Sequence, residues 1–300
     1  MPERVRLAVK GVEYGVDAAR LLAALAADRP DVVHVQWMPV PLMDRAFIGA
    51  LKTIAPVVAT VHDTTPFRGS PSARVQEIGW QGALEAADRL IVHTEFSRQV
   101  LEGRGVPGDR IVRIDHGRLD PGRYVPSPRT GPLRVLLFGA LKTYKGVAVV
   151  AEAVRLLVAD GVDVQLRVVG SPRMELDLAP GVDWDLRWVP DAEVPAVLAE
   201  ADVHVFPYRE IDASGALRTV LGRGAPVVAS NVGGPGELLT HDVDALLVPP
   251  EDPEALARAI RALDSAELRE RLARGGEATA ASLPPWTTIA EQTVAAYVTR

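Results

Sequence analysis

The fold class of this chain is decided by residues 134–169, which read RVLLFGALKTYKGVAVVAEAVRLLVADGVDVQLRVV. The stretch begins and ends with short runs rich in Val and Leu, at Arg134 to Phe138 and Val164 to Val169, and a helical pattern from near Val147 separates them. Short apolar runs that alternate with longer helical patterns are typical of strand–helix–strand units around a parallel sheet. The stretch therefore predicts an α/β protein.

The same alternation continues on both sides of this stretch. Before it we expect four strands, near Val32 to Gln36, Val57 to Val61, Leu90 to His93 and Ile111 to Ile114. Within and after it we expect six, the two quoted above and four near Leu186 to Val189, Val203 to Phe206, Pro226 to Ala229 and Ala245 to Val248. Between the two groups, residues 118–132 read RLDPGRYVPSPRTGP, and their prolines and glycines exclude regular structure.

These patterns predict two domains. The first covers residues 1–120, the linker residues 121–132 and the second domain residues 133–283, while a helix in residues 284–300 is expected to return to the first domain. The chain opens with a helical pattern from Val5 to Ala27 and no strand before it, although a parallel unit normally starts with a strand. Either the first domain is reduced, or an opening segment is missing from this sequence.

Composition excludes several classes of function. The 300 residues are 48% hydrophobic and carry a formal net charge of −6, which argues against a nucleic-acid partner. There are no cysteines, and the six histidines lack the spacing of a helical zinc motif, so we expect no metal site. The sequence has neither a signal peptide nor an apolar run of about 18 residues. We expect a cytoplasmic protein without a transmembrane segment, and any membrane contact would be peripheral.

Two lysines mark the loop after the strand that ends at Phe138. The chain has only four lysines against 29 arginines, yet Lys142 and Lys145 stand three positions apart in this loop, which also contains Gly139. Ammonium groups at the carboxyl end of a parallel strand suit a diphosphate, because strand ends and helix N-termini already form a crevice there. The alternative is a pair of solvated loop lysines.

A second candidate lies in residues 203–230, VHVFPYREIDASGALRTVLGRGAPVVAS. A buried strand ends before Pro207, and Ser214 and Gly215 then open a helix. The free N–H groups of that helix start could bind a phosphate or sugar hydroxyls, since Gly215 has no side chain to block approach. The alternative is an ordinary helix start, because Ser is a good N-cap.

Three further positions carry polar or aromatic groups near strand ends. His62 and Asp63 follow the strand of VVATVHD and could bind a ligand, or Asp63 could cap a helix and His62 be half-buried with its polar atoms satisfied. Glu237, in NVGGPGELL, could bind sugar hydroxyls or cap a helix. Trp37 could line a cleft, although core packing is the prediction we favour.

Together these stretches resemble the family 4 retaining glycosyltransferases, also described as glycosyl transferases group 1. The likeness extends over nearly the whole chain and follows the family's motif order, through PDVVHVQW, VVATVHD, ADRLIVHTEFSRQVL, FGALKTYKG, VPDAEVPAVLAEADVHVFPY, GAPVVASNVGG and ALLVPPEDPEAL. It implies a GT-B fold of two Rossmann-like domains, a nucleoside-diphosphate sugar as donor bound mainly by the second domain, a hydroxyl acceptor met by the first, and no metal or other cofactor.

The resemblance also assigns roles to residues. Lys145 of the YKG element neutralises the diphosphate, Lys142 matches a basic residue of some members, and His62 of the HD element lies beside the donor sugar. The leaving phosphate accepts the proton of the acceptor, so no enzyme base is required, in agreement with the lack of an obvious pair of catalytic carboxylates. The expected donor-binding residues are Gly139, Asp63, Asp212, Ser214, Gly215, Ala216, Leu217 and Glu237.

Two departures from the family keep a second hypothesis open. Many members carry two glutamates eight positions apart at the sugar and ribose site, and Asp212 and Val220 stand at those positions here. The opening strand and its glycine-rich loop are also missing. The leading hypothesis is a retaining, metal-independent transferase acting on a glycan, lipid-linked or small-molecule acceptor, and the alternative is a reduced or inactive relative that binds nucleotide or pairs with another transferase. An epimerase or phosphorylase fits the motif order less well, and no GxGxxG follows a strand as a dehydrogenase would require.

Overall fold

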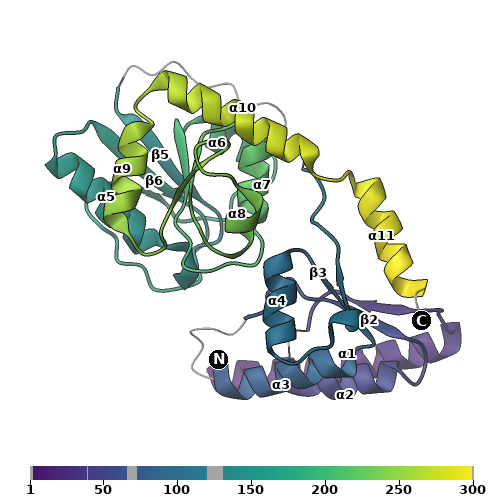
Figure 1. Cartoon of the computed structure of the whole chain (residues 1–300). Coiled ribbons are helices and arrows are strands. Elements are labelled where there is room, and N and C mark those ends of the chain that lie inside the picture. Colours follow the sequence, from purple (N-terminus) through teal and green to yellow (C-terminus); the bar gives the residue numbers. More distant parts are fainter. Residues whose placement is uncertain (1–2, 39, 66–72, 120–130, 299–300) are drawn as a thin grey trace. The chain divides into compact units, whose positions relative to one another are not determined.

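A computed structural model describes residues 3–38, 40–65, 73–119 and 131–298 of this chain. These residues fall into two units, each with its own parallel sheet (Figure 1). The first unit contains Met1–His93, Arg98–Ile114 and Glu291–Arg300, and the second contains Thr94–Ser97 and Asp115–Ala290. Residues 120–130, which make up most of the expected linker, lie outside the described residues. Within the described residues, no helix is both long and apolar enough to cross a lipid bilayer.

The sheet of the first unit has its strands in sequence order, β1-β2-β3-β4, and all are parallel. They are β1 (Val33–Val35), β2 (Val57–Thr60), β3 (Arg89–Val92) and β4 (Ile111–Arg113), so the four expected strands are confirmed to within one or two residues. The helices of this part of the chain are α1 (Glu3–Asp28), α2 (Pro41–Leu51), α3 (Ala73–Ala86) and α4 (Glu95–Gly103), followed by the short η1 (Gly108–Arg110). Parallel pairing brings the carboxyl ends of the four strands to one edge of the sheet.

The core of the first unit lies between this sheet and the pair of helices α2 and α3. Val57, Ala59 and Leu90 are fully buried on the strands, against Ile48 of α2 and Leu84 of α3. The last helix of the chain, α11 (Trp286–Val298), confirms the helical pattern expected after Pro285, and its residues from Glu291 onward belong to this unit.

The second unit has a six-stranded parallel sheet in the order β10-β9-β8-β5-β6-β7. Its strands are β5 (Leu133–Phe138), β6 (Val164–Val169), β7 (Val182–Asp185), β8 (Val203–Phe206), β9 (Val227–Ser230) and β10 (Leu246–Val248). Its helices are η2 (Thr143–Lys145), α5 (Val147–Ala159), α6 (Val194–Ala199), α7 (Gly215–Gly222), α8 (Gly233–Leu238), α9 (Pro253–Ala262) and α10 (Ala266–Ser282). From β5 the strand order runs outward in both directions, which makes the β5–β8 boundary a topological switch point. Ligands of open α/β sheets bind at the carboxyl ends of the strands at such a point.

Helices cover both faces of this second sheet, with α5 and α9 on one face and α6 and α7 on the other (Figure 1). Successive strand residues therefore alternate between two apolar clusters. Val135 and Leu137 of β5 belong to the cluster with α5 and α9, whereas Leu136 packs with α6 and α7. A strand buried on both faces reads as a continuous apolar run, and this is why β5 was recognisable in the sequence.

The strand predicted near Leu186 to Val189 is wrong, because the strand at this place is β7, Val182–Asp185. It is an edge strand, and its residues Val182 to Asp185 pair with Leu166 to Val169 of β6. The segment LRWV that suggested a strand follows the end of β7, and in it Trp188 is 69% exposed while Val189 packs with α6 and α7.

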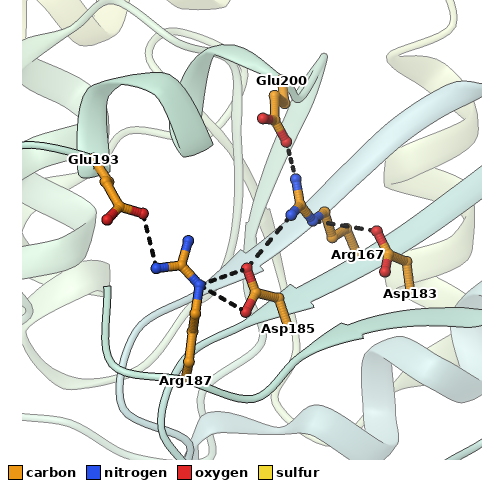
Figure 2. Close-up of polar contacts among 6 residues, drawn as sticks. All are labelled: Arg167, Asp183, Asp185, Arg187, Glu193 and Glu200. Carbon is orange, nitrogen blue, oxygen red and sulfur yellow. Dashed lines mark hydrogen bonds and ion pairs between the residues drawn. The ribbon is translucent and has the colours of Figure 1, made fainter. Parts of the chain in front are cut away.

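Charge rather than apolar burial marks the true edge strand. Figure 2 shows the guanidinium of Arg167, on β6, directed toward Asp183 and Asp185 of β7 and toward Glu200. The Arg167 Nε lies 3.2 Å from Asp183, and Arg187 reaches Asp185 at 3.0 Å from the other side. Acidic residues at alternate positions of β7 therefore face an arginine of the neighbouring strand. A strand of this kind does not read as an apolar run in the sequence.

Candidate functional site

The loops after β5 and β8 meet at the switch point of the second sheet. Gly146, which follows η2, has a left-handed φ of 70°, and a Cβ at this position would overlap the carbonyl oxygen of Pro207. Only glycine allows this approach, so the lysine loop is held against the start of the loop after β8. The first turn of α7 lies beside the same loop, because a Cβ on Gly139 would come within 3.9 Å of the Ala216 side chain.

Lys145 is buried where these loops meet, with only 7% of the residue exposed. Its Nζ donates a hydrogen bond of 2.9 Å to the Tyr208 hydroxyl and lies 4.3 Å from the centroid of the same ring. The reading of Lys145 as a solvated loop lysine is therefore wrong. Lys142, by contrast, is exposed, with its Nζ 5.6 Å from the centroid of the Tyr144 ring.

A chain of hydroxyl groups connects this cation to the start of α7. The Tyr208 hydroxyl lies 2.9 Å from the Ser214 Oγ, which also accepts a hydrogen bond of 3.2 Å from the Leu217 amide. Since the Lys145 ammonium can only donate, the Tyr208 oxygen accepts from it and has its own proton available for Ser214. The N-cap role of Ser214 is thus confirmed. Gly215 and Ala216 precede Leu217 in the first turn, where N–H groups have no acceptor within the helix.

Burial lowers the pKa of Lys145 from 10.5 to about 8. Its hydrogen-bond partner Tyr208 is neutral, and burial raises the pKa of that phenol above its ordinary value. Within the described part of the chain, no carboxylate forms an ion pair with Lys145. A buried cation without a counter-ion is costly, so the geometry favours the binding of an anion at this point.

A second buried cation, Arg218, lies one turn further along α7, and the sequence reasoning missed it. The residue is 6% exposed, and its Nε and Nη1 atoms have no hydrogen-bond partner among the described residues. Burial lowers its pKa, while Asp115 and Glu237 act in the opposite direction. The available signal in the sequence was an arginine within the mostly apolar helix GALRTVLG.

The two acidic residues expected at the donor site have protein partners in the second unit. Asp212 is buried and accepts a hydrogen bond of 2.7 Å from the Ser97 hydroxyl. The carboxylate of Glu237 accepts hydrogen bonds of 3.0 Å from the amides of Glu95 and Phe96. Glu237 therefore caps a helix start, which was the structural alternative for this residue.

The remaining expected residues, His62 and Asp63, lie in the first unit at the carboxyl end of β2. The Asp63 carboxylate accepts a hydrogen bond of 2.9 Å from the Thr65 amide, so it stabilises a turn. The half-buried His62 ring stacks on Trp37, with centroids 4.4 Å apart and an angle of 21° between the planes. Trp37 is 68% exposed, so its predicted role in core packing is wrong.

A separate cavity of about 220 Å³ lies in the second unit and shares no residue with the expected site. Its polar lining consists of Arg134, Gln165, Arg167, Asp183 and Glu200. The lysine loop and the start of α7 are the two predicted features that lie together at the switch point. This cavity lies apart from both. Among the described residues, no group of three or more His, Asp and Glu is placed to hold a metal ion.

Comparison with known proteins shows the family and the fold of this chain. Two family models match the chain, Glycosyltransferase Family 4 over residues 5–118 and Glycosyl transferases group 1 over residues 132–265. A glycogen synthase of Mycobacterium tuberculosis (strain H37Rv) is 26% identical over 296 residues, covering 90% of this chain and 69% of the relative. The putative colanic acid biosynthesis glycosyltransferase WcaL of Escherichia coli K12 is 32% identical over 219 residues, which cover 66% of this chain and 53% of WcaL.

Solved structures show the same fold at lower identity. Anabaena Alr3699/HepE, in complex with UDP and glucose, superposes with a TM-score of 0.75 at 19% identity, covering 93% of this chain and 80% of HepE. The sucrose-phosphate synthase of Thermosynechococcus elongatus gives a TM-score of 0.74 at 21% identity, with 93% and 77% covered. The two family models together match most of the sequence, and the paired parallel sheets are those of GT-B enzymes. The chain belongs to the family 4, group 1 glycosyltransferases.

Proposed function

We propose that this glycosyltransferase takes its sugar from a nucleoside-diphosphate sugar, with retention of configuration at the anomeric carbon and without a bound metal ion. The observation that carries the proposal is Lys145, a buried cation at the switch point with a neutral hydrogen-bond partner. A diphosphate supplies the missing negative charge. The amides of Gly215 and Ala216 open the adjacent helix and supply neutral donors for its oxygens.

The proposed reaction requires little chemistry from the protein. When the glycosidic bond breaks, its electron pair goes to the phosphate oxygen, and the leaving diphosphate gains charge. Lys145 stabilises that charge, so its contribution increases toward the transition state. The acceptor hydroxyl attacks from the same face of the sugar and passes its proton to the leaving phosphate oxygen, so no enzyme base is needed. Lys142, being exposed, can add charge from the solvent side.

Other expected residues have proposed positions around the donor. Gly139 leaves room beside the phosphates, and Ser214 and Leu217 shape the helix start. Asp212, Glu237 and Asp63 are proposed to border the sugar while they keep the hydrogen bonds described above, and His62 to lie beside the donor sugar. The donor class is supported by HepE, solved with UDP and glucose, and by the GDP-mannose-dependent alpha-mannosyltransferase of Mycobacterium tuberculosis, which is 27% identical over 270 residues.

Nucleotide binding in the presence of EDTA tests this proposal. UDP or GDP should raise the melting temperature, since a ligand at 100 times its Kd stabilises the native state by about 2.7 kcal/mol. Uridine and guanosine are the matched controls, because they lack the diphosphate. Protection that appeared only after a divalent ion was added would contradict the metal-independent site. Turnover is then measured with sugar donors that carry the protecting nucleotide, UDP or GDP, and with a set of hydroxyl acceptors. NMR of the product shows whether the anomeric configuration is retained.

Val220 favours a second candidate function, which is the binding of nucleotide without the transfer of a sugar. This residue stands where many family members carry a second glutamate, and here it is fully buried in the apolar cluster with α6 and α7. It cannot contribute a hydrogen bond to a ribose. Nucleotide protection in EDTA without turnover or donor hydrolysis would favour this candidate over the transferase.

A further inference from the structure

The polar cavity on one face of the second sheet has no part in the proposed function. Its volume is about 220 Å³, and most of its polar lining comes from the strands β5, β6 and β7. The strand pairing places Arg134 beside Gln165 and Arg167 beside Asp183. These side chains lie on the face that α6 and α7 cover, because Leu136, two positions after Arg134, packs with those helices.

The cavity lies toward the opposite edge of the sheet from the proposed donor site. Arg134, Gln165 and Asp183 are each the second residue of their strand. Lys145 and Ser214, by contrast, lie in segments that follow the carboxyl ends of β5 and β8. Because the strands are parallel, their amino ends meet at one edge and their carboxyl ends at the other. The two places can therefore be occupied independently.

Ion pairs hold both arginines of the lining in place. Arg134 donates two hydrogen bonds to the buried Asp202 carboxylate, of 2.9 Å from Nε and 2.7 Å from Nη2. The Arg167 guanidinium lies 3.2 Å from Asp183 and also pairs with Glu200 (Figure 2). Side chains that are already fixed lose little conformational entropy when a ligand binds. The polar lining is therefore preorganised.

The same ion pairs determine which charge a ligand can carry. Two arginines and two acidic residues line the cavity, so their formal charges cancel. Asp185 and Asp202, which also pair with these arginines, add negative charge around it, and a phosphate is therefore disfavoured. An ammonium ion gains little, because Asp183 and Glu200 are already paired with Arg167. The charges thus favour a neutral ligand.

The lining keeps hydrogen-bonding capacity that the protein itself does not use. Gln165 is exposed, and no hydrogen bond joins its side-chain amide to another described residue. The side chains of Asp183 and Glu200 are 50% and 56% exposed, so their carboxylates remain accessible beside the ion pairs. An amide both donates and accepts, and a carboxylate accepts. Hydroxyl groups match this set, because each of them can donate and accept.

We propose that this cavity is a second, non-catalytic site, which binds one neutral sugar ring of a saccharide. Its volume lies below the roughly 300 Å³ at which sites for drug-sized ligands begin, so it suits a single ring rather than a nucleotide. The C–H groups of the ring pack against the apolar part of the lining, which consists of Val135, Leu136, Val197 and Ala201. This inference goes beyond the proposed donor site and does not depend on it.

NMR spectra of the full chain, labelled at glutamine side-chain amides, test this site. Methyl α-D-glucopyranoside, methyl α-D-mannopyranoside and maltotriose are titrated at millimolar concentrations, and at least one of them should shift the Gln165 amide signals. Gln165→Leu assigns these signals. The variant should also weaken saccharide binding by about three- to tenfold, the effect of one lost neutral hydrogen bond. Gln292→Leu, at an exposed position of α11, is the matched control and should leave the affinity unchanged.

Competing ligands separate the possible outcomes. Saturating UDP should leave the saccharide-induced shifts of Gln165 in place, and their loss would overturn the proposal of a separate site. So would the absence of a shift with all three saccharides, or equal affinity in wild type and Gln165→Leu. Inorganic phosphate or guanidinium ions that shift these signals more than the saccharides do would refute a neutral ligand. A protein that binds saccharide at Gln165 but gains no protection from UDP or GDP in EDTA would contradict the proposed donor site alone.

Discussion

Replacing Lys145 with Met separates the cost of burying a cation from its use in binding. Burial lowers the pKa of Lys145 from 10.5 to about 8, and one pKa unit corresponds to about 1.4 kcal/mol. The buried, unpaired charge of Lys145 therefore lowers the free energy of unfolding by about 3 kcal/mol at neutral pH. Met has a similar length, no charge and an adaptable shape. Without ligand, Lys145→Met should raise the free energy of unfolding by up to about 3 kcal/mol.

The pH dependence of this gain follows from the direction of the pKa change. The folded state binds the Lys145 proton less tightly than the unfolded state does, so stability rises with pH where the two states differ in protonation. The cost is present in full below about pH 8 and disappears as the pH approaches 10.5. The advantage of Lys145→Met in urea denaturation should shrink over the same range.

Binding and turnover should change in the opposite direction to stability. The variant should lose most of the protection by UDP or GDP, and its donor turnover should fall by about 30- to 1,000-fold, as expected for a preorganised charge stabiliser. Lys142→Met is the matched control for folding, because an exposed lysine contributes within about 0.5 kcal/mol. Unchanged nucleotide affinity and turnover in folded Lys145→Met would refute the diphosphate contact, and a lower stability would refute the burial cost.

Two more variants test how the site is built. Gly146→Ala should destabilise the protein by about 1–3 kcal/mol in urea denaturation, because it combines a left-handed φ with a clash against Pro207, whereas Gly161→Ala, also left-handed but in open space, should cost less. Equal effects would contradict the close approach of the two loops. Tyr208→Phe keeps the ring and removes the bridging hydroxyl, so it should cost about 1–3 kcal/mol of stability and weaken UDP binding. Unaltered stability and calorimetric affinity would show that the link to Ser214 carries no energy.

Local sequence pattern was sufficient for most elements of the fold. The strand Val164–Val169 is present as predicted, and the helix predicted at Val5 to Ala27 is Glu3–Asp28 in the structure. Buried strands read as apolar runs, and helices as longer periodic patterns with caps such as Ser265. These signals depend on residues close together in the chain, so a sequence contains them in full.

The edge strand β7 escaped this reasoning because its environment is not local. Asp183 and Asp185 flank Trp184 and look like loop residues until the pairing with β6 places them near Arg167. For the same reason the exposure of Trp37 could not be deduced. Whether a side chain after a strand end is covered depends on elements that arrive from elsewhere in the chain.

The site shows the same division. The rarity of lysine and the order of the motifs identified Lys145 and Ser214 from the sequence alone, because residue type and spacing carry that information. The burial of Lys145, its hydrogen bond to Tyr208 and the contact of His62 with His93 were decided only by the tertiary structure. These pairs stand 63 and 31 positions apart in the sequence, and only parallel strand pairing brings the ends of separate strands to one edge, where these contacts form.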